Sequence, residues 1–65
     1  MDNKNEKYQK YDKYIGRVLD SRYELVKCIG EGSSAVVFKA DDLRTGRPVA
    51  VKLTQYELEK MFKRA

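Results

Sequence analysis

The pattern of hydrophobic and polar residues changes twice along the chain, near residue 15 and again near residue 54. Between these points, β-branched and aromatic residues form short runs separated by glycine, serine and aspartate, which is typical of strands joined by tight turns. The pattern predicts three strands, over residues 23–29, 35–40 and 48–53.

After the third expected strand the spacing becomes helical. Thr54 and Glu57 are three residues apart, as in a capping box, where each side chain satisfies a free backbone donor of the other residue. Leu58, Met61 and Phe62 then share one helical face and are expected to pack against the sheet. The predicted fold class is α+β: a three-stranded antiparallel sheet with a Gly-rich loop and a short C-terminal helix.

The first segment of the chain has a different character. Residues 1–14 contain no aliphatic side chain after Met1 and repeat loosely every three positions, alternating lysine with tyrosine. Lysine interleaved with aromatic residues can stack on single-stranded bases, but three acidic residues dilute this charge. The composition therefore favours a disordered Lys/Tyr-rich tail whose tyrosines stay outside the core, followed by one domain over residues 15–65.

Composition narrows the possible chemistry. The 65 residues can form only one small core, and the chain has no histidine and a single cysteine, Cys28. Disulfide frameworks, zinc clusters and Ser/His/Asp triads are therefore excluded within one chain, and Cys28 is expected to be buried.

The net charge of +4 is spread along the chain, so no nucleic-acid partner is expected. The longest apolar run, Ala35–Phe38, is too short for a bilayer or a signal peptide, which favours a cytoplasmic protein.

The most informative pattern is the segment Gly30-Glu31-Gly32-Ser33-Ser34-Ala35-Val36-Val37, followed by Val49-Ala50-Val51-Lys52. Glycine lets backbone N–H groups approach phosphate oxygens, and a lysine within an apolar strand needs an anionic partner. A Gly-x-Gly fragment alone also fits an ordinary hairpin turn. A dinucleotide-binding loop must open a helix, which the following valines disfavour, and a Walker-type loop needs a Gly-Lys-Ser/Thr sequence that is absent. The remaining interpretation is a pair of strands joined by a glycine-rich loop that folds over a nucleotide.

Strand alternation predicts which residues share a face with Lys52. A two-residue turn at Thr45-Gly46 would place Lys39 opposite Lys52 and put Val37 and Ala50 on the same face.

Pairing of the first two strands about Ser33 would place Ile29 opposite Val37. Ile29, Val37 and Ala50 would then form an apolar lid for a planar base.

These residues, from Ile29 through the loop to Lys52, together resemble the start of a protein kinase domain, in the style of bacterial serine/threonine kinases. The resemblance covers about Leu19 to Leu53. It implies that Ile29, Val37 and Ala50 enclose the adenine of ATP and that Lys52 pairs with the α- and β-phosphates. It also implies that the loop covers these phosphates, through Gly30, Glu31, Gly32, Ser33, Ser34 and Ala35.

The sequence also departs from the family pattern. Ala35 replaces the third glycine of the loop, and only Glu57 and Glu59 follow Lys52, closer than the glutamate that pairs with this lysine in kinases. The catalytic loop and the Asp-Phe-Gly magnesium site are absent, so no metal ligand and no catalysis by this segment alone are expected. The function expected is that of an ATP-binding segment of a serine/threonine protein kinase.

Two alternatives to this function remain open. The chain could be a non-enzymatic interaction module, docking on a partner such as another kinase chain, or a decayed gene product. In both cases contact would be made through the exposed sheet face and the stripe of Leu58, Met61 and Phe62.

Overall fold

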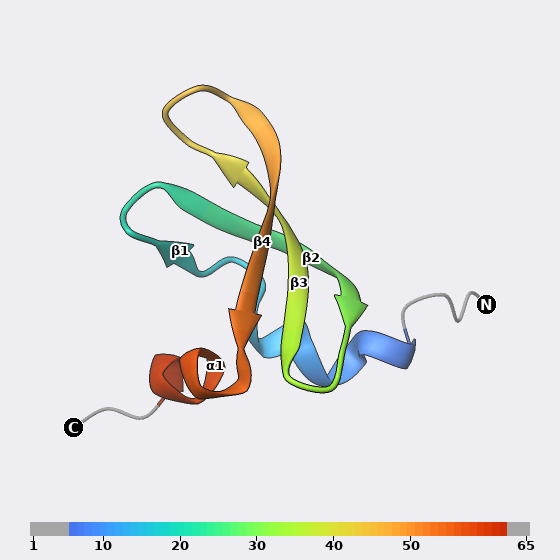
Figure 1. Ribbon diagram of the computed structural model, residues 1–65. Helices are drawn as coiled ribbons and strands as arrows, with labels where there is room; N and C mark the ends of the chain where they lie inside the picture. Colours follow the sequence, from blue (N-terminus) through green and yellow to red (C-terminus); the bar gives the residue numbers. More distant parts are fainter. Residues whose placement is uncertain (1–5, 63–65) are drawn as a thin grey trace.

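The computed structural model describes residues 6–62, with side chains from Tyr8 to Met61, and shows one twisted antiparallel sheet with a helix near each end of the chain (Figure 1). The strands follow the order β1-β2-β3-β4. The elements are the 3-10 helix η1 (Glu6–Tyr14), β1 (Val18–Leu19), β2 (Tyr23–Glu31), β3 (Ala35–Asp42), β4 (Arg47–Thr54) and the α-helix α1 (Gln55–Phe62). The α+β class is confirmed, whereas the prediction of three strands was wrong, because β1 adds a short fourth strand to the edge of the sheet. None of the helices in the described part of the chain is long and apolar enough to cross a bilayer.

The register between β3 and β4 differs from the prediction by two residues. Lys39 pairs with Ala50, and Val37 pairs with Lys52. The predicted pairing of Lys39 with Lys52 was wrong because the connection is a four-residue turn, Leu43–Gly46, instead of a two-residue one. A shift of two preserves the alternation of a strand, so Val37, Lys39, Ala50 and Lys52 still share one face.

The register between β2 and β3 contains two irregularities. One of them lies between Cys28 and Gly30, so that Gly30, and not Ile29, pairs with Val37. The predicted pairing of Ile29 with Val37 was therefore wrong, because a bulge leaves one residue of β2 without a direct partner. Ile29 is that extra residue, and it is 46% exposed.

The core lies on the other face of the sheet from Lys52. Its strand residues include Leu25 of β2, Leu53 of β4 and three residues of β3, namely Val36, Phe38 and Ala40. The alternation along β3 is strict, since these three residues are buried and Val37 and Lys39 between them are not. Among residues 6–62, one sheet face therefore packs inward and the other is left open.

Helix η1 covers the core face beside β2. Tyr11 and Tyr14 are buried there, 6% and 7% exposed, and each ring makes an edge contact with Phe38 at 6.2 Å between centroids. The expectation that these tyrosines lie outside the core was wrong. Their burial also makes these two rings inaccessible for stacking on the bases of a single-stranded nucleic acid.

Helix α1 begins as predicted. The Thr54 backbone N–H donates to Glu57 Oε1 at 2.8 Å, and the Glu57 N–H donates to Thr54 Oγ1 at 3.1 Å, which confirms the capping box. Leu58 is buried in the core and Met61 packs against it, as expected for a stripe that faces the sheet. The side chain of Phe62 lies outside the described residues.

A bidentate ion pair ties the β1–β2 turn to the end of β3. Arg22 Nε and Nη2 donate to the two carboxylate oxygens of Asp42 at 2.9 and 2.8 Å, and the Arg44 N–H donates to the same carboxylate at 2.9 Å. Asp42 is buried, and its hydrogen bonds to Arg22 hold the pKa of its carboxyl far below the usual range.

We expect the ion pair of Arg22 and Asp42 to make the folding stability depend on pH in the acidic range. Because the folded-state pKa of Asp42 is depressed, its contribution is complete above about pH 4, the ordinary pKa of aspartate, and is lost as the pH falls toward the folded-state value. Asp42→Asn should therefore lower the melting temperature at pH 7 by a few degrees and reduce its decline below pH 4. Thermal unfolding of both proteins between pH 7 and pH 2 measures this, and parallel curves would show that Asp42 is not responsible.

Candidate functional site

The candidate site lies on the open face of the sheet, at the end that carries the β2–β3 turn. Gly30 pairs with Val37, and Val37 pairs with Lys52, so these three residues form one row across β2, β3 and β4. Adjacent strands lie about 4.8 Å apart, which places Lys52 on the order of 10 Å from Gly30. The exposed ammonium of Lys52, on its flexible stem, therefore shares a face with the backbone of the Gly-rich loop.

The Gly-rich loop is a tight turn between β2 and β3. The Gly32 N–H donates to the carbonyl oxygen of Ala35 at 2.8 Å, and Ser33 and Ser34 form the exposed tip. Ala35 is half-buried as the first residue of β3. The turn lies at the same end of the sheet as η1, and the longer Leu43–Gly46 turn lies at the opposite end (Figure 1).

The folded chain does not itself require glycine at positions 30 and 32. Neither residue has a left-handed φ, in contrast to Gly46 with φ 77°. A Cβ on Gly30 would lie 3.7 Å from the Val37 Cβ, and one on Gly32 would lie 3.5 Å from the Ala35 carbonyl oxygen, both ordinary contact distances. A side chain at Gly30 would, however, stand beside Val37 on the open face, where it would obstruct a ligand that approaches the loop backbone.

The apolar part of the open face is small. Val37 is half-buried and Ala50 is exposed, and they lie in neighbouring rows of the same face. Ile29 stands at the bulge beside Gly30 with nearly half of its surface exposed. The structure thus brings Val37 and Ala50 together with Lys52, and it leaves Ile29 at the margin of the group.

The row next to Lys52 adds two basic side chains. Lys27 of β2 is paired directly with Lys39 of β3, and both are exposed. Their like charges repel each other. Glu24 and Asp41, paired in the following row, place negative charge beside the two lysines and offset this repulsion. The face is therefore basic toward the Gly-rich loop and acidic away from it.

Glu31 differs from the other loop residues in the direction of its side chain. It pairs with the buried residue Val36, and its carboxylate lies on the side of the sheet that η1 covers. Tyr11 Oη donates to Glu31 Oε2 at 2.7 Å, and Lys10 Nζ lies 3.0 Å from the same oxygen. The hydrogen bond to Glu31 raises the pKa of both Tyr11 and Lys10. The Glu31 carboxylate is thus held away from the face of Lys52.

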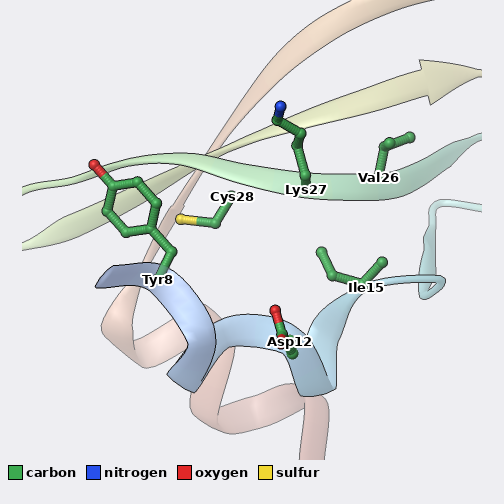
Figure 2. A pocket seen from close by; sticks show the side chains of 6 residues that line it. All are labelled: Tyr8, Asp12, Ile15, Val26, Lys27 and Cys28. Atoms are coloured by element: carbon green, nitrogen blue, oxygen red, sulfur yellow. The ribbon is translucent and has the colours of Figure 1, made fainter. Parts of the chain in front are cut away.

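A shallow groove separates η1 from β2 on the core side. Figure 2 shows Tyr8 and Ile15 pointing toward β2, with the Cys28 sulfur close to Tyr8 and the Lys27 ammonium directed away from η1. Burial raises the pKa of the Cys28 thiol, which lies 3.4 Å from the Gly30 carbonyl oxygen. Cys28 packs against the core cluster, as expected from the sequence, although it is only partly buried.

Sequence comparison with known proteins relates part of this chain to protein kinases. A probable serine/threonine-protein kinase of Clostridium perfringens is 44% identical over 45 residues, which are 69% of this chain and 7% of the relative. CBL-interacting protein kinase 22 of Oryza sativa subsp. japonica is 51% identical over 41 residues, 63% of this chain and 9% of the relative. Cell division control protein 2 homolog 1 of Trypanosoma brucei brucei is 54% identical over 41 residues, 63% of this chain and 14% of the relative.

These relatives place part of the chain in a class by sequence. About 60% of the chain is homologous to the N-terminal part of protein kinases. More particularly, several of the relatives are named as serine/threonine-protein kinases, bacterial ones included. The chain spans only 7 to 14% of the length of the three relatives described above. No family model matches the chain, and no solved structure matches it significantly.

Proposed function

We propose that the open face and the Gly-rich loop bind ATP, as the nucleotide-covering part of a serine/threonine protein kinase. The observation that carries this proposal is the row of Gly30, Val37 and Lys52, which combines an unobstructed backbone, an apolar surface and a cation on the sheet face that residues 6–62 leave open. The similarity to serine/threonine-protein kinases also supports the proposal of ATP binding.

Each part of the site has a role in this proposal. Lys52 pairs with the α- and β-phosphates, because an exposed ammonium on a strand face can form charge-assisted hydrogen bonds with phosphate oxygens. The Gly-rich loop covers the phosphates, with Gly30 and Gly32 permitting close approach. Val37 and Ala50 contact the adenine, with Ile29 at the margin.

The full reaction that we propose for a protein containing this fold is transfer of the ATP γ-phosphate to a serine or threonine hydroxyl. Such transfer depends on positioning and on neutralisation of charge by metal ions. The 65 residues include no Asp-Phe-Gly sequence to bind the metal. We therefore propose nucleotide binding, and not catalysis, for this segment, and we place it in the cytoplasm, where ATP is made and used.

A comparison of two lysine variants tests the proposal. We expect the chain to bind an ATP analogue weakly, with a dissociation constant in the millimolar range, and Lys52→Ala to weaken this binding about tenfold, as for loss of one charged hydrogen bond. Lys39→Ala removes the same charge from the same face, but in the row farther from the loop. It should change the affinity less than twofold when both variants are titrated at equal ionic strength.

Equal losses in the two lysine variants would indicate general attraction between a basic face and a polyanion, and would contradict a defined site. Indistinguishable binding by the wild type and Lys52→Ala would contradict the role of Lys52. The alternative of docking through the helical stripe loses support, since Leu58 is buried within the domain's own core. Docking through the open face would instead appear as self-association or partner capture without an effect of Lys52.

A further inference from the structure

In the described part of the chain, the side chain of Glu31 joins η1 to the Gly-rich loop. Glu31 lies between Gly30 and Gly32, so its backbone belongs to the loop while its carboxylate lies on the η1 side of the sheet. There it accepts a hydrogen bond from Tyr11 at 2.7 Å and forms an ion pair with Lys10 at 3.0 Å. Both partners belong to η1 and act on the same oxygen, Oε2.

The partner of Glu31 is itself held firmly. The Tyr11 ring is 6% exposed and packs against Phe38, which is fully buried at the centre of the sheet, and against Tyr14. A hydroxyl on an immobile ring loses little conformational freedom when it forms a hydrogen bond, unlike the same bond between two mobile surface side chains. Tyr11 therefore transmits the rigidity of the core to Glu31.

Such an anchor adds to the strand pairing of Gly30 with Val37, which by itself leaves the turn beyond Glu31 unrestrained on the η1 side. Glycine loses more backbone freedom on ordering than any other residue, and the loop has Gly30 and Gly32 on the two sides of Glu31. The tip beyond Gly32 is exposed, and Gly32 itself is held by one turn hydrogen bond to Ala35. Holding Glu31 from the η1 side of the sheet restrains both neighbouring glycines. It places no side chain on the open face, where a phosphate would approach.

We propose that Tyr11 is a positioning residue for nucleotide binding: through Glu31, and assisted by Lys10, it holds the Gly-rich loop in the conformation that covers phosphate. This rests on the proposed ATP binding, but its first step, ordering of the loop, does not need a ligand. The N-terminal segment thus acts on the nucleotide face from the opposite side of the sheet. In this role Tyr11 contributes order to the loop and does not itself contact the nucleotide.

The experiment compares Tyr11→Phe with Tyr23→Phe by backbone ¹⁵N relaxation. Tyr11→Phe keeps the ring in the core and removes only the hydroxyl, and Tyr23→Phe removes a hydroxyl from a half-buried tyrosine at the far end of β2. In Tyr11→Phe, order parameters at residues 32–34 should fall from a rigid value near 0.8 to about 0.6. The Leu43–Gly46 turn should not change, which separates loss of the anchor from general destabilisation. Tyr23→Phe should leave both turns as in the wild type.

Two further measurements complete the test. Adding Tyr11→Phe to Glu31→Ala should lower the loop order parameters much less than it does in the wild type, because the Glu31 acceptor is already gone and Gln55, which also interacts with the Tyr11 hydroxyl, belongs to α1 and not to the loop. In titrations with an ATP analogue, Tyr11→Phe should weaken binding about threefold, whereas Tyr23→Phe should not.

Each result has a definite meaning. Unchanged loop order in Tyr11→Phe would overturn the proposal, and so would reduced loop order accompanied by wild-type affinity. Failure of the wild type to bind the ATP analogue would instead overturn the proposed function and with it the positioning role, even if the relaxation data showed that Tyr11 orders the loop.

Discussion

Replacement of both Tyr11 and Tyr14 by alanine is expected to unfold the domain. Each ring is almost completely buried and contacts Phe38, and truncating one large buried aromatic residue costs about 3–5 kcal/mol. A domain of this size rarely has more than about 3–5 kcal/mol of stability in total. The double variant should therefore lose most of its folded population at 25 °C.

Circular dichroism and urea unfolding measure this effect directly. Tyr56→Ala is the matched control, because Tyr56 is 69% exposed on α1, and we expect it to change the free energy of unfolding by less than about 0.5 kcal/mol. A double variant that unfolds at the wild-type urea concentration would contradict the packing of η1 on the sheet. It would favour the prediction that residues 1–14 are a disordered tail outside the core.

The second large effect is expected from Leu58→Ala. Leu58 is 1% exposed and joins α1 to the core, so its truncation should cost about 2–5 kcal/mol, from lost burial and from the cavity that remains. Leu43→Ala makes the same chemical change in the exposed β3–β4 turn, where Leu43 is 53% exposed, and should be nearly neutral. The difference between the two midpoints of urea unfolding gives the contribution of the buried side chain. Equal midpoints would show that α1 does not pack as described.

The strands and α1 could be predicted because their local signals agree with the fold. The centre of β3 alternates between buried and open positions around Val37, and Thr54 with Glu57 marks the beginning of α1 by a cap that forms within four residues. Each of these features depends on neighbours in the sequence. The short strand β1 does not, since two residues become a strand only by pairing with β2, through a turn in which Asp20 and Ser21 adopt a positive φ without glycine.

The N-terminal segment was misinterpreted because its core residues are aromatic and not aliphatic. The repeat of three positions was visible, and three residues per turn is the period of a 3-10 helix. Such a helix places Tyr11 and Tyr14 above one another on one face, toward Phe38. A period of three with tyrosine at the repeated position could have indicated a packed 3-10 helix.

The sequence predicted which site residues share a sheet face more accurately than it predicted which residues pair across the strands. Alternation alone places Val37, Ala50 and Lys52 together, and an error of two residues in the β3–β4 register leaves that result intact. The bulge next to Ile29 and the attachment of Glu31 to Tyr11 could not be predicted, because both depend on tertiary contacts between segments distant in the sequence.

The most direct test of the account is to map the residues that sense ATP by ¹⁵N-¹H correlation spectra during a titration with the nucleotide. Binding at the open face predicts the largest shifts at Gly30, Gly32 and Ser33 in the loop and at Val37 and Lys52 in the strands. Residues 55–61 of α1 and the Leu43–Gly46 turn should shift little. Shifts that are absent up to several millimolar ATP, or that centre on α1, would contradict the claim that this face binds the nucleotide.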